Sequence, residues 1–225
     1  MKLSNGYGGF AAAVNSLLVL LLCLLPVHAQ SAPVRIAMLG DSLTAGYGLQ
    51  PNQSLAARLE AALRSQKRDV VVLNHGVSGD TTAGGLDRVD WMMGDKPDIV
   101  LVALGANDAL RGVDPAAAER NLDGIVKRLK EAGATVWLAG MLAPRNYGAD
   151  YARAFDGIYK RLSEKYDVPL YPFLLDGVAQ EPALNQADGI HPNVKGVDTI
   201  VERMLPFVTS NLDAHATSVR RPARP

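Results

Sequence analysis

The sequence feature that most constrains the fold is a regular alternation of short apolar runs with longer helical segments. Five runs have the length and residue types of β-strands, at 34–39, 70–74, 98–104, 135–141 and 170–173. Between them lie segments with helical apolar spacing, such as 55–64 behind a Ser54 N-cap and the segment opened by Asp114-Pro115. The runs are continuously apolar, as is typical of parallel strands buried on both faces. The sequence therefore predicts a three-layer α/β/α sandwich around a five-stranded, mostly parallel sheet.

The first 29 residues have the pattern of a secretory signal peptide. Lys2 is followed by an apolar run at 17–25 and by a small-residue end at Ala29, with Ala32 as a second cleavage point. The run is shorter than the roughly 20 residues of a membrane span, so a stable membrane anchor is the disfavoured alternative. We predict an exported protein, periplasmic in preference to secreted. Cleavage would remove Cys23, the only cysteine, so no disulfide is expected in the mature chain.

The remaining chain is long enough for one domain with a substantial core, which we place at 30–212. Asn193 is expected to cap the last helix and Pro206 to kink or end it. Residues 213–225, which end in an Arg- and Pro-rich stretch, are predicted to be a disordered basic tail. The 23 basic and 23 acidic residues balance, so charge gives no reason to expect binding to nucleic acid or to a membrane surface. A monomer or weak oligomer is expected.

Four loops carry unusual polar and glycine-rich sequences, at 40–44, 79–81, 105–108 and 188–193. Three of them follow the first three predicted strands. In open α/β sheets ligands bind outside the carboxyl ends of the strands, so these loops are expected to meet at one site. Ser42 in the first loop is then a candidate nucleophile, provided that the other loops supply a base and an oxyanion site.

His191 is the best candidate for that base. The other three histidines lie in the expected terminal segments or have no carboxylate beside them in the sequence: His28, His215 and His75. A serine nucleophile needs an imidazole whose far nitrogen is held by an acceptor, and Asp188 stands three residues before His191. The alternative is a polar turn at the entry to the last helix. His75 is interpreted as a structural or pocket-rim residue.

Three groups are candidates for the oxyanion hole. The N–H of Gly79 can be approached closely because glycine has no Cβ, and Asn107 offers a side-chain amide after the third strand. The N–H of Ser42 itself completes the set. Taken singly, Gly79 and Asn107 are equally typical of turns. Asp41 and Asp108 are interpreted as groups that support these turns.

Taken together, Gly40-Asp41-Ser42-Leu43, Gly79, Gly105-Ala106-Asn107-Asp108 and Asp188-Gly189-Ile190-His191-Pro192 resemble the SGNH, or GDSL, hydrolase family. The flanking sequences 78–81, 144–148 and 166–170 resemble its bacterial periplasmic branch of acyl-CoA thioesterases, lysophospholipases and arylesterases. The resemblance implies a flavodoxin-like fold and hydrolysis of esters and thioesters through an acyl-serine intermediate, without a metal or cofactor. It implies a catalytic triad of Ser42, Asp188 and His191, with Ser42, Gly79 and Asn107 as oxyanion donors.

The substrate implied by this resemblance is a small acyl ester or thioester, such as an aryl ester, an acyl-CoA or a lysophospholipid. Leu142, Pro144 and Tyr147, in the loop after the fourth strand, are candidate pocket-wall residues. Ala106 stands where the family commonly has a second glycine, which would narrow the pocket mouth near Asn107.

Three other functions are compatible with parts of the sequence. A carbohydrate or peptidoglycan O-acetylesterase would use the same triad. A flavodoxin-like or Rossmann-like binding protein is suggested by Gly40, Gly46 and Gly48, although their spacing is not G-x-G-x-x-G. A metal-dependent hydrolase is disfavoured because no histidine pair has ligand spacing.

Overall fold

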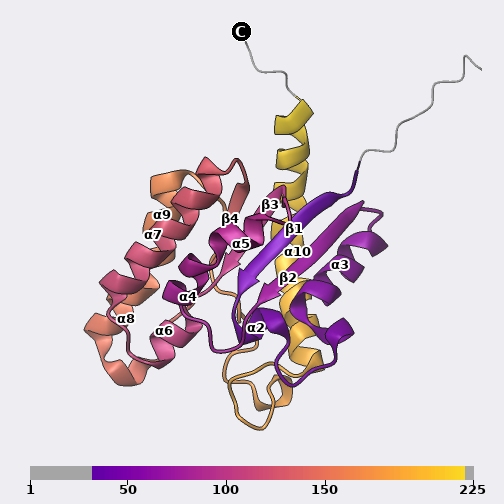
Figure 1. Ribbon diagram of the computed structural model, residues 1–225. Helices are drawn as coiled ribbons and strands as arrows, with labels where there is room; N and C mark the ends of the chain where they lie inside the picture. The colour runs from indigo at the N-terminus through magenta and orange to yellow at the C-terminus, as the bar shows by residue number, and fades with distance from the viewer. Residues whose placement is uncertain (1–31, 221–225) are drawn as a thin grey trace, which may run out of the picture. The chain divides into compact units, whose positions relative to one another are not determined.

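The computed structural model describes residues 32–220, and the predicted signal peptide and residues 221–225 lie outside this range. Its centre is a five-stranded sheet in the order β2-β1-β3-β4-β5, with every neighbouring pair parallel (Figure 1). The strands are β1 (Val34–Gly40), β2 (Val70–Gly76), β3 (Ile99–Ala103), β4 (Thr135–Ala139) and β5 (Leu170–Tyr171). The predicted parallel sheet and α/β/α class are confirmed.

Nine α-helices and three 3₁₀ turns connect and follow the strands in the described part of the chain. The helices are α2 (Ser42–Ala45), α3 (Leu55–Ser65), α4 (Thr82–Asp87), α5 (Val89–Met93), α6 (Ala106–Leu110), α7 (Pro115–Glu131), α8 (Ala149–Asp156), α9 (Ile158–Tyr166) and α10 (Val194–Arg220). The 3₁₀ turns are η1 (Pro51–Gln53), η2 (Arg145–Tyr147) and η3 (Pro182–Leu184). The three expected N-caps are present: Ser54 Oγ accepts the Ala57 N–H at 3.4 Å, Asp114 Oδ1 accepts that of Ala116 at 3.1 Å, and Asn193 Oδ1 accepts that of Gly196 at 3.1 Å.

The helices form a layer on each face of the sheet. α3 and α10 pack together on one face, and α7 packs against α4, α5, α8 and α9 on the other (Figure 1). The central strands β1 and β3 are almost wholly apolar and are buried between these layers. The largest fully buried side chains are Trp137, Tyr159 and Phe155. This core holds the carboxyl ends of the strands in fixed positions, and the polar loops extend from those ends.

The second strand differs from the expectation of a fully buried strand. β2 lies at the edge of the sheet, and its residues alternate between buried and partly exposed. Val70 and Val72 are buried, whereas Val71 and Leu73 are only partly covered. Successive side chains of a strand point to opposite faces, so at this edge of the sheet one face of β2 is covered more fully than the other.

The C-terminal segment also differs. α10 continues past Pro206 to Arg220, so the predicted disordered tail is wrong for residues 213–220. Two contacts hold the extension to the domain: an ion pair between Asp213 and Arg68, and a 3.0 Å hydrogen bond between His215 Nδ1 and Thr135 Oγ1. No helix within residues 32–220 has both the length and the apolar character needed to cross a membrane.

Candidate active site

Ser42 lies at the point where β1 turns into a helix. Gly40 ends the strand, and Ser42 is the first residue of α2. Asp41 caps this helix, since its Oδ1 accepts the Leu43 N–H at 3.0 Å. A Cβ on Gly40 would lie 2.0 Å from Oγ1 of Thr44, so the turn requires glycine there. The turn directs Ser42 to the carboxyl end of the sheet, where its side chain lines a cavity.

Ser42, His191 and Asp188 form a continuous hydrogen-bonded row. His191 Nε2 lies 2.9 Å from Ser42 Oγ, and His191 Nδ1 lies 2.7 Å from Asp188 Oδ2. The other carboxylate oxygen of Asp188 accepts the main-chain N–H groups of His191 at 3.0 Å and Ile190 at 2.9 Å. Main-chain and side-chain hydrogen bonds from His191, followed by the Ile190 N–H, lower the pKa of Asp188 to about 2. The ionised carboxylate therefore holds Nδ1–H and leaves Nε2 free to accept the serine proton.

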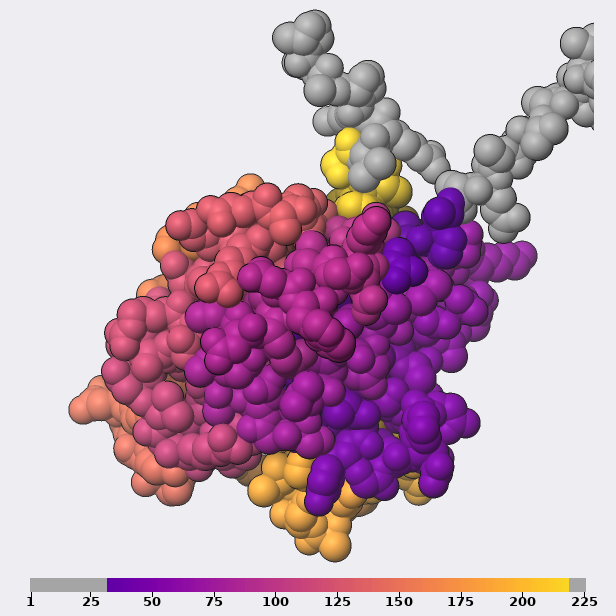
Figure 2. All heavy atoms as spheres, viewed as in Figure 1, coloured from indigo at the N-terminus to yellow at the C-terminus, as the bar shows by residue number. Residues whose placement is uncertain are grey.

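The segment that carries Asp188 and His191 is irregular, but it is tied to the body of the domain. Gln186 N donates to the His191 carbonyl at 2.7 Å, and its side-chain amide donates to the Tyr47 carbonyl at 2.8 Å. The ring of Tyr47 lies against the imidazole of His191, with centroids 4.5 Å apart. Figure 2 shows this segment, in orange, against the indigo part of the chain that follows β1. These contacts bring the histidine to a serine 149 positions away in the sequence.

The loops after β2 and β3 carry the predicted oxyanion donors Gly79 and Asn107, of which Asn107 lines the cavity beside Ser42. Gly79 has φ +82°, in a turn closed by a 3.0 Å bond from Asp80 N to the Val77 carbonyl. Asn107 lies in the first turn of α6 and donates its amide to the Asp80 carbonyl at 2.9 Å. Among residues 32–220, no acceptor takes the N–H of Ser42 or of Gly79. Such unpaired donors are suited to a developing oxyanion.

The two aspartates beside these motifs support the loops. Asp41 is fully buried, and its Oδ2 lies 3.3 Å from the Asn107 amide nitrogen. Burial raises the pKa of Asp41 to about 6, against the opposing effects of the Leu43 N–H and the Asn107 amide. Asp108 accepts the N–H of Thr82 at 2.8 Å and its hydroxyl at 2.6 Å. Asp108 thus joins the start of α4 to α6.

A cavity of about 480 Å³ opens beside Ser42, His191 and Asn107. Leu142 and Pro144 line its wall, as predicted from the sequence, and Ala106 also contributes to the lining. Most of the other apolar residues of the wall were not predicted from the sequence to line a pocket: Leu110, Met141, Phe173, Leu175 and Ile190. Phe173 and Leu175 precede the irregular segment and Ile190 lies within it, where no periodicity indicates which side chains point inward.

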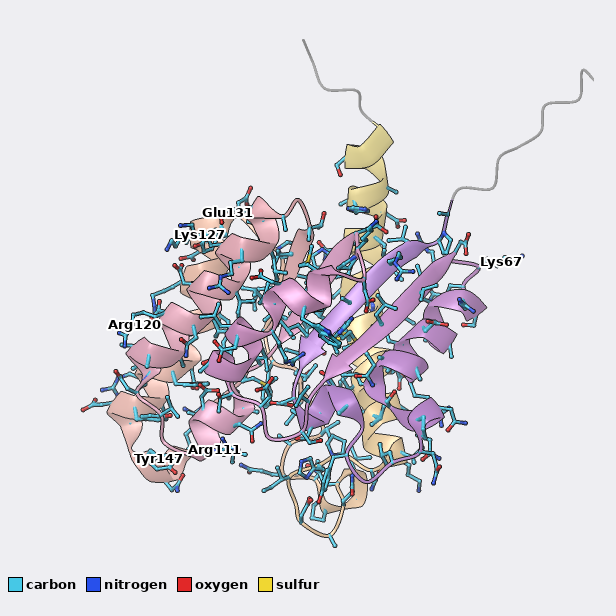
Figure 3. The ribbon with its side chains drawn as sticks, in the orientation of Figure 1. Lys67, Arg111, Arg120, Lys127, Glu131 and Tyr147 are labelled. Carbon is cyan, nitrogen blue, oxygen red and sulfur yellow. The ribbon has the colours of Figure 1, made fainter. Side chains whose placement is uncertain are left out.

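Tyr147 does not line this cavity. Its hydroxyl donates to the Leu110 carbonyl at 2.9 Å, and its ring packs on that of Tyr151 with centroids 5.2 Å apart. Figure 3 shows Tyr147 at the lower left edge of the molecule, near Arg111. The prediction that Tyr147 forms the pocket wall is therefore wrong, because η2 directs its side chain toward α6 and α8.

His75 is structural and lies away from the cavity wall. Its ring is buried, with Nε2 3.2 Å from Asp95 Oδ2, and it makes a T-shaped contact with the ring of Trp91 at a centroid distance of 5.7 Å. Burial lowers the pKa of His75, and the nearby Asp95 offsets part of that effect. The carboxylate missing from the neighbouring sequence is supplied 20 positions along the chain. Of the two positions expected for His75, structural or at the pocket rim, the structure shows the structural one.

A parallel α/β/α sheet with a Ser–His–Asp row at its carboxyl edge defines the class of this protein as a serine hydrolase. Within that class, the chain belongs to the GDSL-like lipase/acylhydrolase family, which it matches over residues 38–198. The protein is thus an acyl hydrolase of the SGNH type that the sequence motifs resemble.

Three relatives illustrate the similarity. An arylesterase of Vibrio mimicus is 39% identical over 199 residues, which cover 88% of this chain and 96% of the relative. Thioesterase 1/protease 1/lysophospholipase L1 of Escherichia coli K12 is 40% identical over 175 residues, or 77% of this chain and 82% of the relative. The psychrotrophic esterase EstA from Pseudoalteromonas sp., in a crystal structure inhibited by monoethylphosphonate, has a TM-score of 0.76 and 33% identity, and the match covers 80% of this chain and 98% of EstA.

Proposed function

We propose that the protein hydrolyses small acyl esters and thioesters through a covalent acyl-Ser42 intermediate. The observation that carries the proposal is the hydrogen-bonded row from Ser42 through His191 to Asp188, at the mouth of an apolar cavity. The row supplies a nucleophile, a base and the group that orients the base, and the cavity gives the acyl chain a place beside the nucleophile.

In the proposed reaction His191 Nε2 takes the proton of Ser42 as its Oγ attacks the acyl carbonyl. The negative oxygen that forms is bound by the N–H groups of Ser42 and Gly79 and by the amide of Asn107. Collapse of this intermediate breaks the bond to the alcohol or thiol, which leaves with the proton from His191. Water, deprotonated by His191, then attacks the acyl carbonyl. The bond to Ser42 Oγ breaks, His191 returns the proton to Oγ, and the carboxylic acid is released. Asp188 stays ionised throughout and stabilises the imidazolium.

The proposed substrates carry acyl chains longer than acetyl, on aryl alcohols, coenzyme A or lysophospholipids. The apolar wall and the 480 Å³ cavity support this, because an acetyl group would leave most of that space unfilled. The relatives named arylesterase and thioesterase/lysophospholipase support the same substrate classes. A sugar O-acetylesterase with the same triad is the competing function.

The acyl-chain preference can be measured with p-nitrophenyl esters of two to sixteen carbons. We expect kcat/KM to rise from acetyl to medium chains, since each buried methylene contributes about 0.8 kcal/mol of binding. Leu142→Asp should remove much of this rise while leaving acetyl ester hydrolysis nearly unchanged. A strict preference for acetyl would contradict the proposal and favour the O-acetylesterase.

Asn107→Ala tests the proposed oxyanion donor. Loss of one such donor is expected to lower kcat by roughly 10²–10³-fold, because its hydrogen bond is strongest in the transition state. Steady-state kinetics on an aryl ester separates kcat from KM. A change confined to KM would exclude this role for Asn107.

We further propose that the protein is exported and acts as a monomer or weak oligomer in the periplasm. The proposal is supported by the apolar run at 17–25 and the cleavage pattern at Ala29, both in the part of the chain that the structure does not describe. N-terminal sequencing of the protein from osmotic-shock fluid of its host would identify the mature start.

A further inference from the structure

We propose that Arg88 is a positioning residue for the oxyanion hole. Arg88 holds Asp80, and Asp80 in turn holds the Asn107 amide in place. The proposal rests on the function proposed above. Arg88 does not line the cavity and would touch no substrate, so its effect on the reaction would be indirect.

Arg88 stands between α4 and α5 and has a side chain only 16% exposed. Each nitrogen of its guanidinium makes a short bond to a different part of the loop region. Nε donates to Asp80 Oδ2 at 2.7 Å, and the two terminal nitrogens donate at 2.8 Å to the carbonyls of His75 and Gly40. The planar fork of arginine fits three such acceptors, which a lysine ammonium on its flexible stem does not. Arg88 thus joins the carboxyl ends of β1 and β2 to Asp80.

Asp80 transmits this restraint to the oxyanion donors. Its carboxylate is held by Arg88, and its main-chain carbonyl accepts the Asn107 amide at 2.9 Å. Its neighbour Gly79 is held from the opposite side, because Arg111 donates to the Gly79 carbonyl at 2.9 Å. The segment that offers the Gly79 N–H and orients Asn107 is therefore fixed by two arginines from different helical regions.

The bonds of Asn107 show why the position of Asp80 matters. One bond of the amide goes to the Asp80 carbonyl at 2.9 Å, and the contact with Asp41 Oδ2 is longer, at 3.3 Å. We infer that the bond to Asp80 directs the amide and that the weaker contact with Asp41 is given up when the oxyanion forms. Oxyanion donors act at about 2.7–3.1 Å, so a shift of a few tenths of an ångström in Asp80 would weaken transition-state binding.

A double-mutant cycle between Arg88→Gln and Asn107→Ala tests the proposal. Arg88→Gln alone is expected to lower kcat on a p-nitrophenyl ester about 10–100-fold with KM within about twofold, as for a loss of transition-state binding. In the Asn107→Ala background the same change should cost less than about twofold, because the amide that Arg88 positions is gone and Gly79 keeps its bond from Arg111. Equal losses in both backgrounds, or an unchanged kcat in the single variant, would overturn the role of Arg88.

Two further variants separate positioning from a general loss of structure. Arg64→Gln is the matched control: Arg64 donates to the Val70 carbonyl at 3.0 Å and pairs with Glu60, at the amino end of β2. It should leave kcat unchanged. Asp80→Asn keeps the main-chain carbonyl but weakens the ion pair with Arg88, and it should reproduce the kcat loss and its disappearance in Asn107→Ala. If Arg88→Gln does not fold, a double-mutant cycle between Asp80→Asn and Asn107→Ala tests the role of Arg88 by the same criteria.

Labelling with a fluorophosphonate keeps the two proposals distinct. Mass spectrometry of the wild-type protein shows whether Ser42 carries the label. An active enzyme unlabelled at Ser42 would contradict the proposed function together with the role of Arg88. A labelled Ser42 with additive effects in the cycle would contradict the role of Arg88 alone.

Discussion

Ser42→Ala is expected to lower kcat/KM for aryl esters by at least about 10⁴-fold, with the midpoint of thermal unfolding unchanged within about 2 °C. The substitution removes one oxygen atom, Oγ, which lies 2.9 Å from His191 Nε2 and is the proposed nucleophile. The neighbouring bonds of the turn are made by Asp41 and by main-chain groups, so the fold does not depend on the hydroxyl. The residual activity would come from the remaining oxyanion donors and substrate binding.

The measurement combines ester hydrolysis with fluorophosphonate labelling of both proteins. Ser65→Ala is a matched control, since Ser65 lies exposed at the end of α3 and its hydroxyl donates only to the Ala62 carbonyl, at 2.7 Å. This control should keep full activity and full labelling. Near-normal turnover in Ser42→Ala would reject Ser42 as the nucleophile.

Asp188→Asn is expected to lower kcat by about 10³–10⁴-fold while KM changes little. An asparagine can present its NH₂ group to His191 Nδ1, which then accepts a proton instead of donating one. The proton moves to Nε2, and the imidazole can no longer accept the proton of Ser42. The backbone bonds from Ile190 and His191 can be kept by the amide oxygen, so the turn should persist.

A surface aspartate of the same segment provides the control for this variant. Asp176 pairs with Arg203 at 2.7 Å and lies outside the cavity wall, so Asp176→Asn should leave kcat unchanged. The pH profile adds a second check. Because the pKa of Asp188 is lowered to about 2, its carboxylate is ionised above about pH 4, and it should contribute no acid limb to the profile above that value. An Asp188→Asn variant with the wild-type kcat would exclude the role of Asp188 in orienting His191.

The fold class could be predicted because it depends on local pattern. Apolar runs such as those of β1 and β3 can only be buried in the centre of a sheet, and the helical segments between them supply the two covering layers. Strand order could not be predicted in the same way, because any order satisfies the pattern. The edge position of β2 is a consequence of that order. The docked end of α10 depends on an ion pair between Asp213 and Arg68, which are distant in the sequence.

The candidate site likewise has some features that follow from local sequence and others that depend on distant contacts. Ser42 follows a strand directly, and Asp188 and His191 share one turn, so their chemistry is visible in short stretches of sequence. The parallel sheet then implies that the loops after its strands meet at one edge. The cavity wall, the contact of Tyr147 with α6, and the link from Arg88 through Asp80 to Asn107 are not visible in this way.

The sequence by itself thus determined the class of fold, the proposed nucleophile and base, and the edge of the sheet where they would be found. Those features depend on residue type, periodicity and spacings of a few residues. Only the tertiary structure decided which side chains face the cavity, which histidine is structural, and which arginine is linked through Asp80 to the proposed oxyanion donor Asn107. The physical reason is that a loop side chain points toward whatever it can pack against or bond to, and for His75, Tyr147 and Arg88 those partners come from other parts of the chain.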